Sequence, residues 1–211
     1  MCIRDRIRRM SVTEIETADT YDEDGAPITG GLMDGRLGTL EPRQRCKTCG
    51  NTAQNCPGHF GHIELAVPVV HVGFTKIVYE LLTVTCRDCG RLLLAEDKIE
   101  NYRVRMKEYA RVLNEVPTAF FETVKKEAKR TAECPHCGRA QYAIEHVKPT
   151  TYHEALEGGG SVTLEAAAIR SRLERIPDED LRLLRYDPVS ARPEWMVLQV
   201  LPSRPCMLGP R

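Results

Sequence analysis

The spacing of hydrophobic positions changes several times along the chain, and each spacing predicts a different kind of element. Residues 11–45 are rich in Gly, Asp and Pro with little periodicity, which is typical of loops and turns. Residues 61–66 and 67–70 favour two short extended segments. Apolar residues then recur at helical spacing from Phe74 to Val84, which predicts an amphipathic helix.

Two further helices are expected beyond this point. One covers about residues 97–114 and the other about residues 117–131, with Pro117 at a first helical position, where its missing N–H costs nothing. Because the connection is short, the two helices are expected to form a helical hairpin that returns the chain to Cys134.

The last part of the chain alternates short elements with breaks. Residues 141–152 resemble a strand and turn, and the three glycines at 158–160 form a flexible break. Thr163 can cap a helix that runs to about Ile176, and Pro177 opens another short helix. The pattern as a whole predicts an α+β fold that is irregular and loop-rich.

Composition limits how large a core such a fold can have. The 211 residues can hold one or two domains, but 6% of them are aromatic and 28% are charged, so any single core should be modest. No apolar run approaches the roughly 20 residues that cross a bilayer, and residues 1–6 lack a signal-peptide core. We expect no membrane contact.

Four closely spaced pairs of metal-binding residues are the strongest chemical signal. They are Cys46 and Cys49, Cys56 and His59, Cys86 and Cys89, and Cys134 and Cys137. Two such pairs make one tetrahedral Zn²⁺ site, so four pairs predict two zinc ions. Both sites should be structural, because four protein ligands leave no open position for a catalytic water.

The first two pairs are predicted to bind one ion together. Only six residues separate Cys49 from Cys56, so this site closes as a local loop. His62 is a competitor for the fourth position, but His59 keeps the two-residue spacing of the other pairs. We therefore assign His59 as the ligand and expect His62 and His71 to pack nearby.

The second site joins pairs that lie far apart in sequence. Between Cys89 and Cys134 there are 44 residues, and a cross-braced arrangement that exchanges pairs between the sites is an alternative. Local closure of the first site argues against that exchange. Redox dithiols are a second alternative, but no strand–helix pattern of the thioredoxin kind surrounds these pairs.

The cysteine count also indicates a compartment. Of nine cysteines, all but Cys2 and Cys206 fall in the four pairs, which favours a reducing environment where thiolates persist. We expect the cytoplasm.

Charge is balanced overall but unevenly distributed. The formal net charge is zero, which argues against a free-standing, strongly basic nucleic-acid binder. Residues 13–24 carry six acidic and no basic side chains, whereas residues 98–133 carry nine basic and six acidic ones. Any contact with nucleic acid is expected in the second segment, on one side of a helix, although a merely solvated face would show the same pattern. The candidates are Lys125, Lys126, Lys129 and Arg130.

Several motifs carry a resemblance that goes beyond spacing. The most specific is Cys-Pro-Gly-His-Phe-Gly-His at residues 56–62, and others lie at 21–25, 31–38, 46–50, 71–74, 86–94, 134–138 and 192–196. Over about residues 7–202 the chain resembles the N-terminal region of the largest subunit of multisubunit DNA-directed RNA polymerase, archaeal A-prime type.

The resemblance implies an RNA polymerase clamp-like fold, braced by two structural zinc sites that use the eight residues above. It divides the chain into an unmatched extension (1–6), an N-terminal clamp region with the first site (7–95), a helical insert (96–133), the remainder of the clamp, which completes the second site (134–202), and an unmatched tail (203–211). The two unmatched ends suggest an incomplete or frame-shifted reading of a longer gene.

The resemblance also implies an activity and partners. The enzyme transcribes DNA into RNA by nucleotidyl transfer, with Mg²⁺ held by three aspartates in an Asn-Ala-Asp-Phe-Asp-Gly-Asp run. This run is absent from the sequence, so no catalytic residue is expected in this segment and Mg²⁺ only in the full-length subunit. The implied partners are other polymerase subunits, template DNA, the RNA–DNA hybrid and transcription factors.

Two other classes of protein are alternatives. A stand-alone zinc-binding adaptor of the cross-braced type needs interleaved pairs and an exposed apolar groove. A zinc-dependent nucleic-acid-binding regulator should present a basic, aromatic-bearing face, and a zero net charge with Trp195 as the single tryptophan gives little sign of one.

Overall fold

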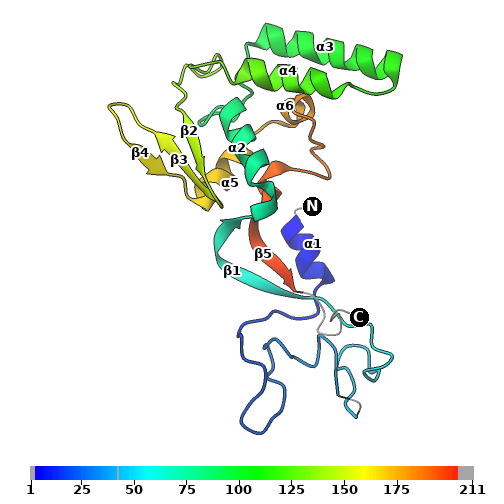
Figure 1. The fold of residues 1–211 in the computed structure, drawn as a ribbon. Helices are drawn as coiled ribbons and strands as arrows, with labels where there is room; N and C mark the ends of the chain where they lie inside the picture. The colour runs from blue at the N-terminus through cyan, green and yellow to red at the C-terminus, as the bar shows by residue number, and fades with distance from the viewer. Residues whose placement is uncertain (1–2, 42, 204–211) are drawn as a thin grey trace. The chain divides into compact units, whose positions relative to one another are not determined.

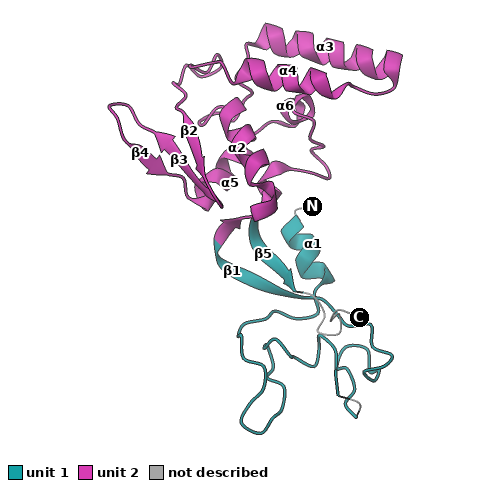
Figure 2. Ribbon diagram, viewed as in Figure 1, with its two compact units in different colours: residues 1–67, 198–211 teal, residues 68–197 magenta. Residues whose placement is uncertain are grey.

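The computed structural model of the chain describes residues 3–41 and 43–203 (Figure 1). Cys2 and Cys206 lie outside the described residues. The chain divides into two compact units, residues 1–67 with 198–211 and residues 68–197 (Figure 2). In the described ranges, no helix has both the length and the apolar character needed to cross a membrane.

The first unit contains little regular structure. Helix α1 covers Ile3–Met10, and strands β1 (Gly61–Val70) and β5 (Val197–Ser203), which fall mostly in this unit, pair with each other. Residues 11–41 and 43–60 form loops and turns joined by isolated bridges, as predicted for 11–45. One continuous strand replaces the two extended segments expected at 61–70.

Helix α1 was not expected. Ile3, Ile7 and Met10 recur along it at helical spacing and Ile7 is buried, but a helix of 8 residues is too short to form from its own sequence alone. Its cationic side chains have distant partners. Arg8 donates from Nε and Nη2 to the two carboxylate oxygens of Glu64 at 2.6 and 3.0 Å, and Arg4 donates to the Gln199 side chain at 3.2 Å. Such long-range pairs fix a short helix that its own sequence would not.

The second unit holds most of the regular elements. They are the 3₁₀ turn η1 (Val72–Phe74), α2 (Thr75–Val84), α3 (Glu96–Leu113), α4 (Thr118–Ala128), β2 (Ile144–Val147), β3 (Thr151–Ala155), β4 (Ser161–Thr163), α5 (Ala166–Glu174), α6 (Asp178–Leu183) and the 3₁₀ turn η2 (Pro193–Met196). The predicted helix at 74–84 is confirmed as α2. The overall mixture of helix and sheet is consistent with the predicted α+β class.

Helices α3 and α4 form the predicted hairpin and run side by side in Figure 1. The rings of Tyr102 and Tyr109 meet Phe120 edge-on, with centroids 5.6 and 5.7 Å apart. Tyr102 also donates its hydroxyl to Glu127 at 2.5 Å. Pro117 is the N-cap of α4 and not its first helical residue, because its ψ of 139° is extended.

Strands β2, β3 and β4 form an antiparallel sheet in that order, with Ile144 opposite Glu154 and His153 opposite Thr163. The glycines at 158–160 all have positive φ and make the turn from β3 to β4. The predicted capping role of Thr163 is wrong, because this residue pairs in β4 and its hydroxyl lies 3.1 Å from His153 Nδ1. Glu165 takes the N-cap position of α5.

The two units differ in how much apolar surface they bury. A continuous core fills the second unit, where residues such as Val78, Leu92 and Leu173 are completely buried. Among the described residues of the first unit, the buried apolar side chains are Ile7, Ile15, Leu37 and Val200, together with Cys46 and Cys56. Two members of the predicted metal site are therefore part of what little core this unit has.

Asp180 is a fully buried carboxylate that joins three segments of the second unit. Its Oδ2 accepts from the Leu92 backbone N–H at 3.0 Å and from Arg91 Nε at 2.9 Å, and Arg103 Nη2 of α3 lies 3.5 Å from Oδ1. This one side chain therefore ties α6 and α3 to the segment that follows Cys89.

We expect Asp180→Asn to lower the free energy of unfolding by about 3 kcal/mol, because it leaves cationic groups without their buried partner. Urea denaturation followed by circular dichroism measures the loss. Glu100→Gln is the matched control, since Glu100 is an exposed partner of Arg103 and its loss should cost less than ~1 kcal/mol. Equal losses in the two variants would contradict the role of Asp180.

Candidate metal centres

Three Cys-x-x-Cys-Gly segments fold in the same way. In each, the first cysteine donates its N–H to the carbonyl five residues later, at 2.8–2.9 Å, and the glycine donates its N–H back to the first cysteine's carbonyl at 2.8–3.1 Å. The first cysteines are Cys46, Cys86 and Cys134, and the glycines are Gly50, Gly90 and Gly138. The local sequence thus determines a tight turn that presents two thiols on one side.

Glycine is required in this turn for conformation, and at Gly90 for space as well. The φ angles of the three turn glycines lie between 69° and 74°, where side chains are disfavoured. A Cβ on Gly90 would lie 2.6 Å from the carbonyl oxygen of Arg175. Arg175 in turn donates from Nη1 to the Asp88 carbonyl at 2.6 Å, so the end of α5 lies directly against this turn.

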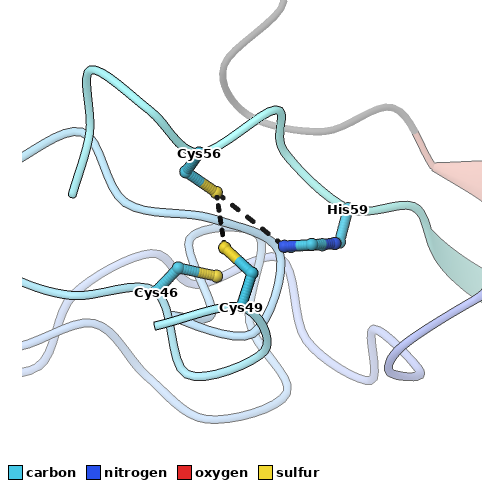
Figure 3. Close-up of side chains that lie close together, drawn as sticks. All are labelled: Cys46, Cys49, Cys56 and His59. Carbon is cyan, nitrogen blue, oxygen red and sulfur yellow. Dashed lines mark hydrogen bonds between the residues drawn. The ribbon is translucent and has the colours of Figure 1, made fainter. Parts of the chain in front are cut away.

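The first group consists of Cys46, Cys49, Cys56 and His59, whose side chains converge on one point (Figure 3). All four ligand atoms lie within 4.8 Å of one another. The Cys49 and Cys56 sulfurs are 3.6 Å apart, and His59 Nε2 lies 3.8 Å from the Cys56 sulfur.

The choice of His59 over His62 agrees with this geometry. His62 is engaged elsewhere, with Nδ1 2.7 Å from the Ser11 hydroxyl and Nε2 3.6 Å from Glu64. His71 is an N-cap whose ring accepts from the Gly73 N–H at 3.0 Å. His62 therefore has a local packing role, whereas His71 is an exposed capping residue of the second unit.

A buried carboxylate orders the loop behind the first group. Asp34 is 1% exposed and accepts from the Gly30 N–H at 2.6 Å, while Arg36 contacts its carboxylate with Nε and Nη2. The side-chain hydrogen bonds from Arg36 hold the pKa of Asp34 well below its usual range. This role could not be predicted from the sequence, because Asp34 lies in a segment whose composition is typical of simple turns.

The loop ordered by Asp34 supports the ligand turns directly. Gly35 O accepts from the Lys47 N–H at 3.0 Å, and Arg36 O accepts from the Thr48 hydroxyl at 2.7 Å. Leu37 O accepts from the N–H of the ligand His59 at 2.8 Å. The first group is therefore held from outside as well as by its own turns.

The second group consists of Cys86, Cys89, Cys134 and Cys137, again with all ligand atoms within 4.8 Å. Cys86 and Cys137 sulfurs are 3.5 Å apart, and those of Cys89 and Cys134 are 3.7 Å apart. The predicted pairing is confirmed, and the cross-braced exchange of pairs is not found. The α3–α4 hairpin occupies the 44 residues between the pairs.

Gln141 supports the second group in a way that the sequence did not reveal. Its Oε1 accepts from the Arg87 N–H at 3.1 Å, and its Nε2 lies 3.5 Å from the Cys86 sulfur. The amide thus links the two turns beside a ligand. It lies outside every Cys-x-x-Cys segment, so spacing alone could not identify it.

The thiols of the second group resist ionising together. Burial opposes ionisation of Cys86, but the N–H groups of Cys89 and Asp88 outweigh it and lower the pKa of Cys86 to about 7. Burial and the neighbouring thiols raise the pKa of Cys89 to about 12. A bound divalent cation removes this conflict, because its charge stabilises all four thiolates at once.

The donor sets fit zinc. One group offers three sulfurs and one nitrogen and the other four sulfurs, which are ligand sets of four-coordinate structural Zn²⁺ sites. Cys49 and Cys137 are exposed while Cys46, Cys56, Cys86 and Cys134 are buried, so each group lies at the edge of its unit. With four protein donors in each group, neither offers a place for a substrate.

The predicted basic cluster does not form one face of a helix. Helix α4 ends at Ala128, so Lys129 is its C-cap and Arg130 lies beyond it. Lys125 Nζ lies 3.1 Å from Glu80 and 3.3 Å from Glu122, whereas Lys126, Lys129 and Arg130 are exposed. The helix ends earlier than the expected residue 131 because residues 129–131 turn back toward Leu93, whose carbonyl accepts from the Thr131 hydroxyl at 2.8 Å.

Comparison with known proteins shows the family to which the chain belongs. The family model of RNA polymerase Rpb1, domain 1, matches residues 1–211. The chain belongs to this family. It is 49% identical over 207 residues to DNA-directed RNA polymerase subunit Rpo1N of Sulfolobus acidocaldarius and 50% identical over 206 residues to Rpo1N of Methanocaldococcus jannaschii. Those matches include 97% and 98% of this chain, but 23% and 15% of the relatives. Thermococcus celer Rpo1N is 48% identical over 208 residues, 97% of this chain and 23% of that relative.

One prediction for this Rpb1 domain 1 chain concerns Asp34. Because its folded pKa is depressed, its contribution to stability is present above the unfolded pKa of about 3.9 and is lost as pH falls from there toward the folded pKa. We expect Asp34→Asn to be about 2 kcal/mol less stable than the parent at pH 7, with the difference shrinking only below about pH 4. Denaturation of both proteins across this pH range measures it.

Asp24→Asn serves as the control, because Asp24 is exposed in a turn of the same unit and should change stability by less than about 0.5 kcal/mol. A constant difference between Asp34→Asn and the parent down to pH 2 would contradict the assigned ionisation.

A further prediction separates the two centres. We expect Cys49→Ser to lose one of two bound zinc ions and Cys137→Ser to lose the other, because each ligand belongs to a different group. Elemental analysis of the dialysed proteins measures the metal content. Loss of both ions in either variant would show that the groups depend on each other.

Proposed function

We propose that the chain is the N-terminal part of the largest subunit of an archaeal-type DNA-directed RNA polymerase and that it acts within the assembled, cytoplasmic enzyme. The observation that carries the proposal is identity of about half the residues to Rpo1N proteins over nearly the whole chain. The three-aspartate motif does not occur in this sequence, so this segment positions other parts and does not hold the catalytic Mg²⁺.

Within that enzyme we assign this segment to the clamp, which closes over template DNA and the RNA–DNA hybrid. Two complete four-donor groups support this assignment. A clamp moves as a rigid body, so its internal structure must stay fixed while it closes. A zinc ion in each group would fix loops that bury few apolar side chains, and folding would be coupled to metal binding. The proposal includes the predicted division into an N-terminal clamp region (7–95), a helical insert (96–133) and the remainder of the clamp (134–202).

The proposed partners are other polymerase subunits, template DNA, the hybrid and transcription factors. Direct contact of Lys125, Lys126, Lys129 and Arg130 with nucleic acid stays a prediction. Lys126 and Arg130 are its best candidates, since both are exposed and neither has a carboxylate within ion-pair distance among the described residues. A stand-alone adaptor is disfavoured because the two centres are not interleaved.

The test is a reconstituted archaeal polymerase whose largest subunit carries residues 7–202 in place of its own equivalent segment. We expect promoter-directed RNA synthesis, and a severalfold loss in the Cys49→Ser and Cys137→Ser forms because an unfixed clamp closes poorly. Lys107→Gln, an exposed change on α3, is the control for surface effects.

Two results would contradict the proposal. One is a chimaeric subunit that binds two zinc ions but does not assemble. The other is full activity after both centres have been disrupted. Sequencing the locus past the codon for Pro202 provides an independent check, since the frame should continue to the three-aspartate motif.

A further inference from the structure

Two adjoining clefts lie in the second unit. Their volumes are about 330 and 470 Å³, and Tyr79, Thr83 and Lys129 line both of them. The shared residues make the two clefts one continuous surface that extends from α2 and α4 to the segment before β2. Neither cleft is lined by a metal ligand, although Gln141, which lies 3.5 Å from the Cys86 sulfur, lines the first. The surface includes Lys125, Lys126, Lys129 and Arg130, for which contact with nucleic acid is predicted above.

The surface carries cationic side chains that are not neutralised. Within the described part of the chain, no carboxylate lies within 4.0 Å of the cations of five lining residues, namely Lys76, Arg87, Lys126, Lys129 and Arg130. The carboxylates that line the clefts are already paired. Lys125 contacts Glu80 and Glu122, and Arg172 binds Glu154 through two hydrogen bonds of 2.9 and 2.6 Å. The clefts therefore attract anions.

The aromatic rings of the clefts hold cations in place. The Arg87 guanidinium lies 4.2 Å from the Tyr142 ring centroid, and Lys129 Nζ lies 5.5 Å from that of Tyr79. Tyr79 also stacks with His146, whose ring centroid is 6.1 Å away. Single-stranded nucleic acid gains much of its affinity from bases stacked on free aromatic faces. The rings of Tyr79 and Tyr142 already contact other side chains of the protein, so they are less suited to stacking with bases.

Apolar side chains complete the lining. The accessible apolar side chains of the first cleft are the half-buried Ile144 and the exposed Ala132 and Ala143, whereas Leu82 and Leu93 are almost fully buried behind them. A phosphodiester backbone gains nothing from such contacts, whereas a peptide that alternates acidic and apolar side chains satisfies both the cations and the apolar wall. Fixed cations beside apolar surface are thus better matched to a protein segment than to a nucleic acid.

We propose that these adjoining clefts bind an acidic, partly apolar peptide segment of another protein. The surface is then a docking site for a partner protein, which is the alternative to contact of Lys126, Lys129 and Arg130 with nucleic acid. Charge complementarity brings the segment to the clefts, and contact of its apolar side chains with the walls retains it there.

The test uses the zinc-loaded full chain and a fluorescein-labelled peptide of repeated Glu-Glu-Leu, with binding followed by fluorescence anisotropy at physiological salt. We expect saturable binding, about tenfold weaker for Lys126→Gln combined with Arg130→Gln, because two charge-assisted contacts are removed. Lys107→Gln on α3 is the matched control, since it removes one exposed charge outside both clefts. Retention of two zinc ions verifies that each variant is folded.

Two comparison probes decide between ligand classes. A Glu-Glu-Ser peptide of equal charge should bind more weakly, because it lacks apolar side chains. If it binds equally well, or if Lys107→Gln weakens binding as much as the cleft variant, the attraction is unspecific and the proposal is wrong. Tighter binding of a single-stranded DNA oligonucleotide, weakened by the same cleft variant, would overturn it in favour of nucleic acid. Failure of all probes to bind would also overturn it, without bearing on polymerase assembly.

Discussion

The structure depends on two groups of four metal-binding side chains, each held close to one point although ionised thiols repel one another. Burial and the neighbouring thiols raise the pKa of Cys89 to about 12, so the thiols of this group do not readily ionise together. A bound metal ion would stabilise all the thiolates and so crosslink the turns that carry them. The peptide turns make the arrangement possible, since each places two sulfurs on one side by backbone hydrogen bonds alone.

The two units use this link differently. In the second unit a continuous apolar core surrounds the ligand turns, and the buried Asp180 joins the turn that follows Cys89 to α3 and α6. In the first unit the described residues bury few apolar side chains, and Asp34 orders the loop behind the ligands. The second group is surrounded by an apolar core, whereas the first group would stabilise a unit that has little core of its own.

The candidate centres could be predicted from the sequence because their information is local. A two-residue spacing and a following glycine determine each turn, and the six-residue gap between Cys49 and Cys56 decides which pairs meet. The helical hairpin was equally predictable from apolar spacing. Features that depend on distant partners could not be predicted. Helix α1 is held by Glu64 and Gln199, and the role of Asp180 depends on residues almost ninety positions away. Thr163 was misassigned because strand pairing outweighed its capping preference.

The α3–α4 hairpin leaves the second centre after Cys89 and returns to it at Cys134. Both ends of the excursion are therefore fixed at one point, whatever lies between them. Lengthening a loop whose ends are already together costs little, about 0.6 kcal/mol for each doubling. The outer turns of this hairpin can thus change in length at little cost to the closure of the centre, which makes the position suited to insertions.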